Sequence, residues 1–153
     1  MTESNLNTGK LKFFDSEKID DVLQKTSRVY LTGHLETPQK LLEHFDDIKS
    51  EMGISQYDDY TPELPHMHTL NTEFNFVING TVKVLLVETG EEHTIQAGGM
   101  FIIEQNMPYC TKVKAGSRVV FFKTPGGNDK QLVPISKATA RWMDSWDAVW
   151  EDE

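Results

Sequence analysis

The stretch PHMHTLNTE, residues 65–73, carries most of the information in this 153-residue chain. Side chains two apart on a β-strand point to the same side, so His66 and His68 are expected to aim both imidazoles at one point. The next four residues allow the chain to turn, and Glu73 then opens another predicted strand. Two neutral imidazoles and one carboxylate form a good site for a first-row divalent metal ion.

The region around this stretch, residues 54–124, alternates short apolar runs with turn residues. Asn79-Gly80 is a strong hairpin signal because both residues tolerate positive φ. Many short strands at regular spacing indicate an all-β sandwich or barrel. The predicted strands are Glu73–Ile78, Thr81–Glu88, His93–Gln96, Met100–Glu104, Tyr109–Val113 and Arg118–Lys123.

The spacing continues to Gly80, six residues beyond Glu73. The run His66-x-His68-(x)4-Glu73-(x)6-Gly80 resembles the first motif of the cupin superfamily in all four residues and every spacing. The resemblance covers roughly residues 60–124. It implies an all-β fold, a double-stranded β-helix (jelly-roll) cupin barrel, with N-terminal and C-terminal helical extensions. It also implies one divalent metal ion near the barrel mouth, held by His66, His68 and Glu73.

The second cupin motif is only partly kept. Gly90 can start it and Gly98-Gly99 resembles its turn, but Tyr109 stands where the family has a fourth ligand, a histidine. Three roles are possible for Tyr109. A metal ion could bind it as a phenolate ligand, the protonated hydroxyl could hydrogen-bond a metal-bound ligand or a substrate, or the side chain could only fill space.

Residues 1–53 are expected to form a helix and strand extension packed on the barrel. Ser16–Gln24 carries apolar residues at helical spacing, and Arg28–Leu35 reads as a strand. Thr37-Pro38 resembles a helix start, and the apolar positions that follow predict a helix ending near Gly53. These apolar positions are Leu41, Leu42, Phe45, Ile48 and Met52.

Residues 125–153 are predicted to form a loop and a Trp-rich helix beyond the barrel core of residues 54–124. Trp142, Trp146 and Trp150 recur at every fourth position, which places three rings on one helical stripe. Such a stripe would pack on the barrel or on a second subunit. Homodimers are common among similar proteins, so the resemblance favours a homodimer.

Composition excludes several classes of protein. The chain has 15 Lys and Arg against 24 Asp and Glu, a net charge of −9, which makes nucleic-acid binding unfavourable. No apolar run is long enough for a membrane span, and the start of the chain has no secretory pattern. One cysteine, Cys110, cannot form an intrachain disulfide, so we expect a cytoplasmic protein.

Other polar residues are weaker candidates. Asn75 follows Glu73 by two residues and should share its side of the strand, where it could bind substrate or satisfy a backbone group. Gln105 lies in a loop near the expected barrel mouth and is a second candidate for substrate binding. Glu104 is expected to face solvent, and Cys110 to point away from the metal.

The sequence therefore predicts a metal-dependent enzyme that acts on a small polar molecule. The metal ion, which could be Fe, Mn, Ni, Zn or Cu, would support either dioxygenase chemistry or isomerase, epimerase or lyase chemistry. In the second case Tyr109 is the candidate catalytic proton donor. The alternative is a non-catalytic barrel that binds or senses a small ligand, since cupins host many functions.

Overall fold

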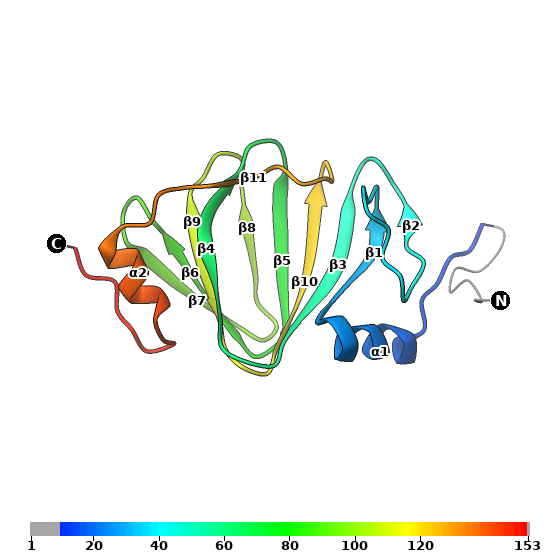
Figure 1. Cartoon of the computed structure of the whole chain (residues 1–153), viewed down its shortest axis with the longest axis horizontal. Coiled ribbons are helices and arrows are strands. Elements are labelled where there is room, and N and C mark those ends of the chain that lie inside the picture. Colours follow the sequence, from blue (N-terminus) through cyan, green and yellow to red (C-terminus); the bar gives the residue numbers. More distant parts are fainter. Residues whose placement is uncertain (1–9, 153) are drawn as a thin grey trace.

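A computed structural model of the chain describes residues 10–152. Two β-sheets face each other, with the helices α1 (Ser16–Thr26) and α2 (Lys137–Met143) at opposite ends of the molecule (Figure 1). One sheet has six strands in the order β2-β1-β3-β10-β5-β8, and the other has five in the order β11-β4-β9-β6-β7. The fold is therefore mostly β, as the sequence predicts.

The larger sheet joins strands from both halves of the sequence, which is typical of a jelly roll. All strand pairs are antiparallel except β1 with β2. The strands of the larger sheet are β1 (Arg28–Gly33), β2 (Phe45–Asp46), β3 (Glu51–Tyr57), β5 (Thr72–Asn79), β8 (Met100–Ile103) and β10 (Ser117–Thr124). The smaller sheet contains β4 (Thr61–His68), β6 (Thr81–Leu86), β7 (Glu91–Gln96), β9 (Tyr109–Val113) and β11 (Lys130–Leu132).

The turn between β5 and β6 confirms that the motif glycine adopts a positive φ, but it is not a hairpin, because β5 and β6 lie in different sheets. Gly80 has a φ of 80°, and a Cβ atom there would lie 2.0 Å from Ser117 Oγ. A larger residue would therefore meet both a strained backbone and a buried neighbour. All six predicted strands between residues 73 and 123 form, with ends that differ by at most two residues.

The predicted helix over residues 38–52 is wrong. This segment has no helix; it contains bends, the two-residue strand β2 and the start of β3. Of its apolar stripe only Leu42 is buried, whereas Leu41 and Ile48 are exposed. A helix of this length is stable only when its apolar face is buried, and this segment has no surface that buries it. Met52 instead pairs with Phe122 in the sheet.

The predicted N-terminal helix and strand are both present. Val22 and Leu23 of α1 pack against Val29 and Leu31 of β1, so the helix covers the outer side of the larger sheet. A separate cluster inside the barrel, which includes Val77, forms the core between the sheets. No helix among residues 10–152 is both long and apolar enough to cross a membrane.

The C-terminal tryptophans do not form one helical stripe. The helix α2 ends at Met143, so only Trp142 belongs to it. The Trp142 ring is fully buried against Leu85 and Cys110 of the same chain, and Trp150 packs near them. The surface that the sequence offers to a second subunit is thus largely used to cover the barrel's own outer face.

Candidate functional site

His66 and His68 lie side by side on β4 with both side chains inside the barrel. Both are buried, with exposures of 1% and 4%. Tyr109 of β9 is the register partner of His66, and Glu73 lies at the start of β5 in the opposite sheet. The strand alternation that predicts converging imidazoles is therefore present, and the connection from β4 to β5 carries Glu73 to the opposite sheet.

The four side chains meet at the Tyr109 hydroxyl. Its oxygen lies 2.9 Å from His66 Nε2, 3.0 Å from His68 Nε2 and 2.9 Å from Glu73 Oε2. His68 Nε2 and Glu73 Oε2 are themselves 2.8 Å apart. A single polar cluster thus unites all the residues that the sequence offers as metal ligands.

The outer nitrogen of each imidazole is already engaged. His66 Nδ1 donates to the Leu64 carbonyl at 2.8 Å, and His68 Nδ1 donates to Asp129 Oδ1 at 2.9 Å. Such contacts fix both rings with Nε2 directed into the cluster. Metal-binding histidines commonly have this arrangement, in which a carboxylate or a carbonyl holds the far nitrogen.

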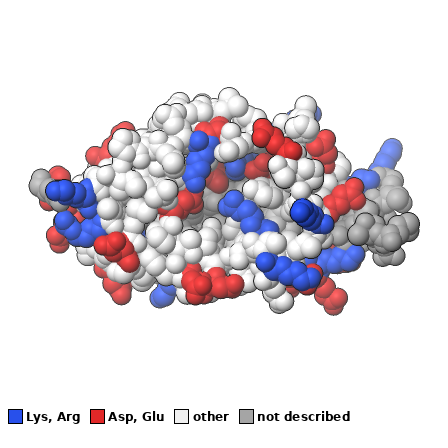
Figure 2. Space-filling view, viewed as in Figure 1, with Lys and Arg blue, Asp and Glu red and all other residues white. Residues whose placement is uncertain are grey.

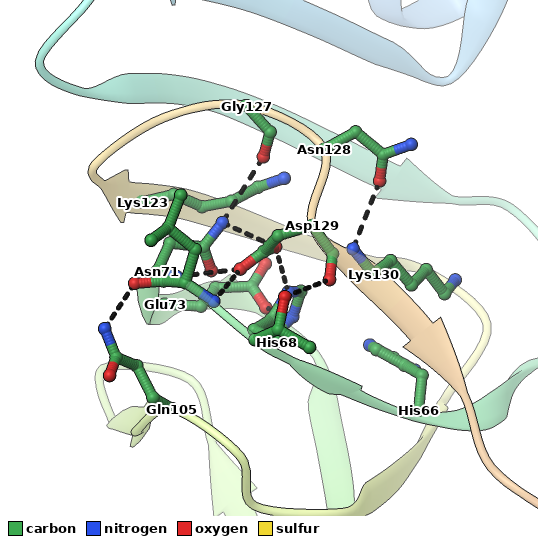
Figure 3. Close-up of polar contacts among 12 residues, drawn as sticks. His66, His68, Asn71, Glu73, Gln105, Lys123, Gly127, Asn128, Asp129 and Lys130 are labelled. Carbon is green, nitrogen blue, oxygen red and sulfur yellow. Dashed lines mark hydrogen bonds and ion pairs between the residues drawn. The ribbon is translucent and has the colours of Figure 1, made fainter.

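Asp129 contacts His68 and also the turn that follows β4. Its Oδ2 atom accepts hydrogen bonds from the backbone N–H groups of Leu70 and Asn71, at 2.8 and 2.7 Å, and Oδ1 accepts one from the Asn71 side chain. Figure 3 shows Asp129 beside His68 and Asn71, on the segment that leads into β11. Sequence reasoning missed Asp129 because it lies about 60 residues from the motif, in a loop with no distinctive pattern.

The protons of the cluster can be assigned from its contacts. A tyrosine hydroxyl has one hydrogen, so Tyr109 can donate to Glu73 or to His66 but not to both. Burial lowers the pKa of His66, with Glu63 opposing it, so this ring is neutral. Burial also lowers the pKa of His68, but Glu73 and Asp129 outweigh that effect and raise it overall. His68 is therefore the better donor of the two.

The pKa values of Glu73 and Tyr109 are shifted in opposite directions. Burial alone would raise the pKa of Glu73, but the hydrogen bond from His68 and its charge lower it below the usual value. Burial and the neighbouring Glu73 and Glu63 carboxylates raise the pKa of Tyr109 far above its usual value. In this arrangement Glu73 is ionised and Tyr109 keeps its proton.

The donor set suits a divalent metal, but its spacing is that of a hydrogen-bonded cluster. Residues 10–152 contain no group of three or more His, Cys, Asp or Glu side chains already arranged to hold a metal ion. Ligands at about 2.1 Å from a metal lie roughly 3 Å apart when at right angles. The 2.8 Å separation of His68 and Glu73 is close to this value. The Tyr109 hydroxyl contacts all three ligands, so a metal ion there requires the hydroxyl to shift or to become a ligand.

Glu63 is a further carboxylate that sequence reasoning missed. Strand alternation places it on the opposite face from His66, but a β-bulge lies between Glu63 and His66 in the pairing of β4 with β9. The bulge turns both side chains inward, and Glu63 Oε1 lies 3.2 Å from His66 Nε2. The same oxygen lies 3.2 Å from Lys130 Nζ.

The cluster opens onto a cavity of about 630 Å³ between the two sheets. Figure 2 shows this face hollowed near its centre, with acidic and basic side chains around the hollow. Asn75 is buried and lines the cavity. Gln105 is exposed, is not among the lining residues, and donates from Nε2 to the Leu70 carbonyl. Cys110 points away from the cluster, as expected, and packs under Trp142.

Comparison with solved structures identifies the fold. KdgF from Halomonas sp. matches 82% of this chain and 98% of its own at a TM-score of 0.50 and 15% identity. A protein with a double-stranded β-helix domain from Klebsiella pneumoniae matches 57% of this chain and 77% of its own, at a TM-score of 0.50 and 16% identity. The chain has the cupin fold.

Another solved structure with the same fold, from work on the DMSP lyases RdDddP and RnDddQII, has a TM-score of 0.56 and 14% identity. It matches 70% of this chain and 52% of its own length. No protein-family model matches the sequence, and neither does any curated protein. Similarity at these identities establishes the cupin fold and leaves the reaction to be argued from the site.

Proposed function

We propose that this cupin is a metal-dependent enzyme that acts on a small polar molecule, with one divalent metal ion held by His66, His68 and Glu73. The observation that carries the proposal is the convergence of these three side chains on the Tyr109 hydroxyl at the inner wall of a cavity. Two imidazole nitrogens and a carboxylate bind Fe, Mn, Ni, Zn or Cu, and leave further coordination positions for a substrate.

The bound metal ion would polarise a carbonyl or hydroxyl oxygen of the substrate, or bind dioxygen. The protein's own groups favour the first option, which is isomerase, epimerase or lyase chemistry over a dioxygenase reaction. Tyr109 is protonated at neutral pH, as an ordinary tyrosine is, so its hydroxyl can donate a hydrogen bond or a proton to a substrate oxygen. Burial and Glu73 raise its pKa and make it a weak acid, which favours the hydrogen-bonding role in the metal-free cluster. Glu73 lies 2.9 Å from the hydroxyl, and Glu63 lies 3.2 Å from the neighbouring His66.

The remaining residues of the site position these groups. Asp129 and the Leu64 carbonyl hold the imidazoles with Nε2 inward. Asn75 lies on the cavity wall, two residues from Glu73, where its amide can hydrogen-bond a substrate. One structure with the same fold comes from work on DMSP lyases, and extending lyase chemistry to this chain is part of the proposal.

The first test is metal content per chain by inductively coupled plasma mass spectrometry, on untagged protein made without added metal. We expect close to one equivalent in the wild type and a loss in His68→Ala. Tyr109→Phe removes the hydroxyl but none of the three ligands, so it should keep the metal while losing turnover. No metal in the wild type, and none taken up on titration, would contradict the metalloenzyme proposal.

A non-catalytic ligand-binding barrel is the alternative, and one observation favours it. One arrangement of protons satisfies the cluster without a metal ion: Tyr109 donates to His66 Nε2, and His68 Nε2 donates to Glu73. Failure to bind metal, together with saturable binding of a small ligand, would support this reading. A homodimer and a cytoplasmic location stay predictions, and light scattering on the purified protein tests the first of them.

A further inference from the structure

The cavity contains a second polar group that the metal site does not use, the guanidinium of Arg28. Arg28 begins β1 in the larger sheet, and its side chain lines the same cavity as His66 and Glu73. The residue as a whole is exposed, so a ligand can reach it, while the Nε side of the guanidinium is partly buried against Ser55. Burial of the guanidinium lowers its pKa, but Tyr30, Tyr57 and Glu63 raise it overall, and arginine stays charged in any case.

Two lysines that line the cavity have carboxylate partners, whereas Arg28 has none among residues 10–152. Lys123 Nζ lies 3.1 Å from Glu51, and Lys130 Nζ lies 3.2 Å from Glu63, so both lysines are paired. Within residues 10–152, no Asp or Glu oxygen lies within 4.0 Å of the Arg28 guanidinium. The cavity therefore carries a cation whose charge no described side chain neutralises in direct contact.

Arg28 is nevertheless held in place. Its Nε atom donates to Ser55 Oγ at 3.0 Å, and its guanidinium carbon lies 4.9 Å from the centre of the Phe121 ring. Tyr30 contributes a longer contact from its hydroxyl, 3.5 Å from Nη1. The Nη2 atom makes no hydrogen bond to any residue that the structure describes. An arginine that is fixed by its Nε and by an aromatic ring presents a ready edge for an anion.

We propose that the substrate carries a carboxylate, which Arg28 binds while the reacting oxygen lies at His66, His68, Glu73 and Tyr109. This inference rests on the proposed function and specifies its substrate class. Because Lys123 and Lys130 are paired with Glu51 and Glu63, Arg28 offers a single positive charge to a ligand, which suits a singly charged carboxylate better than a phosphate dianion. The apolar wall that includes Phe121 and Val119 suits an uncharged middle part of the molecule.

The test uses benzoate as the probe, with benzamide as its uncharged match and phenyl phosphate as the dianionic one. Dissociation constants are measured by ligand-observed NMR on the protein as purified, in wild type, Arg28→Gln and His68→Ala. Arg118→Gln is the control, because Arg118 lies on the same sheet, binds Asp20 and Gln56, and is not among the lining residues. Metal content and melting temperature are recorded for every variant.

We expect benzoate to bind the wild type at least tenfold more tightly than benzamide, and Arg28→Gln to abolish that difference, since a charge-assisted hydrogen bond commonly contributes this much. Arg118→Gln should keep the difference, and Arg28→Gln should keep its metal. Benzoate binding that is lost in His68→Ala but unchanged in Arg28→Gln would overturn the inference. So would the absence of benzoate binding, or an Arg28-dependent preference for phenyl phosphate.

These outcomes separate the inference from the proposed function. Arg28→Gln leaves all three proposed metal ligands intact, so a metal-free wild type refutes the metalloenzyme and says nothing against Arg28. An Arg28-dependent preference for benzoate in metal-free protein would still establish the carboxylate site. A wild type with one metal ion and no such preference would refute the carboxylate site alone. Arg28→Lys adds a gradation, because it keeps the charge but loses the planar fork and should bind benzoate with intermediate affinity.

Discussion

Strand β9 carries two buried polar sites, one on each face, and they differ in what satisfies them. On the inner face Tyr109 meets His66, His68 and Glu73. On the outer face Lys112 is fully buried, and its Nζ donates to the carbonyls of Trp142, Ser145 and Ala148. The inner groups are side chains that border a cavity, whereas the outer partners are backbone carbonyls.

The outer site fastens the C-terminal segment. All three hydrogens of the Lys112 ammonium are used, and the group lies 4.2 Å from the centre of the Trp142 ring. Tyr60 and Lys83 add hydrogen bonds to the carbonyls of Met143 and Trp146. Burial lowers the pKa of Lys112 to about 8, so it is still mostly charged at neutral pH. With every donor used, nothing is left to bind a ligand.

The comparison shows that burial of a charged group is not by itself a sign of function. A group whose partners are all backbone atoms holds two segments together, and its loss should reduce stability. A group whose partners are other titratable side chains beside a cavity can exchange them for a ligand, and its loss should reduce binding. The predictions below test this division.

The largest effect on stability is expected from Lys112→Met. It removes a charged donor from the carbonyls of Trp142, Ser145 and Ala148, of which that of Ser145 also accepts from the Ala148 N–H. The free energy of unfolding should fall by about 3 kcal/mol. The melting temperature should drop by roughly 6–12 °C in a chain of this size. Urea unfolding, followed by tryptophan fluorescence, measures both the loss and the release of Trp142.

Lys114→Met is the matched control for that experiment. Lys114 lies just beyond β9 and is exposed, and its Nζ lies 5.7 Å from the centre of the Trp146 ring. Its loss should change the free energy of unfolding by less than about 0.5 kcal/mol. Metal content should stay the same in both lysine variants. Equal stability of the two lysine variants would show that the outer site does not fasten the C-terminal segment.

The second prediction concerns the inner site and the residue that orients it. Asp129→Asn keeps the shape of the side chain but removes the charge that holds His68 and receives two backbone N–H groups. Metal affinity should fall about 10- to 100-fold, as for other changes to groups that orient a metal-binding histidine. Calorimetric titration of chelator-treated protein with Zn²⁺ measures it. An affinity within twofold of the wild type would remove Asp129 from the site.

The third prediction separates the two histidines by pH in metal-free protein. The pKa of His68 is raised from 6.5, so its protonated ring stabilises the fold. This contribution to the free energy of unfolding is complete below about pH 6.5 and is lost as pH rises through the folded-state pKa. The pKa of His66 is lowered from 6.5, so the fold loses stability as pH falls below about 6.5, where the unfolded chain binds the proton. The two effects should produce a maximum of stability near that pH.

Single variants should reshape this profile in opposite ways. His68→Gln should flatten the decline in melting temperature above pH 6.5, and His66→Gln should flatten the decline below it. Melting temperatures between pH 5 and 8 in the presence of a chelator provide the measurement. Identical profiles for the two variants would mean that the two imidazoles are not distinguished by their surroundings.

The smallest effect is expected at Gln105. The sequence places this residue at the barrel mouth, but its side chain is exposed and its amide donates to the Leu70 carbonyl. Gln105→Ala should therefore change benzoate affinity less than twofold and the free energy of unfolding by less than about 0.5 kcal/mol. Asn75→Ala, on the cavity wall, provides the contrast and should weaken ligand binding more. A larger effect of Gln105 than of Asn75 would reverse this order.

The sequence by itself determined the parts of this protein that rest on local periodicity. Strand alternation places His66 and His68 on one face, and the turn at Gly80 brings the motif into a β-barrel. Six of the strands and the shared face of His66 and His68 follow from such short-range rules. The jelly-roll barrel and the complete set of proposed ligands came from the resemblance to the cupin motif. Tyr109 was recognised as a member of the site, with its role left open.

Only the tertiary structure decided the features that depend on contacts distant in sequence. The bulge that turns Glu63 inward, the approach of Asp129 to His68 and the position of Arg28 in the cavity have no local signal. The expected helix over residues 38–52 failed for the same reason, since an amphipathic pattern forms a helix only where a surface buries its apolar face. Local rules specify which way a side chain points, and packing between distant segments decides what it meets.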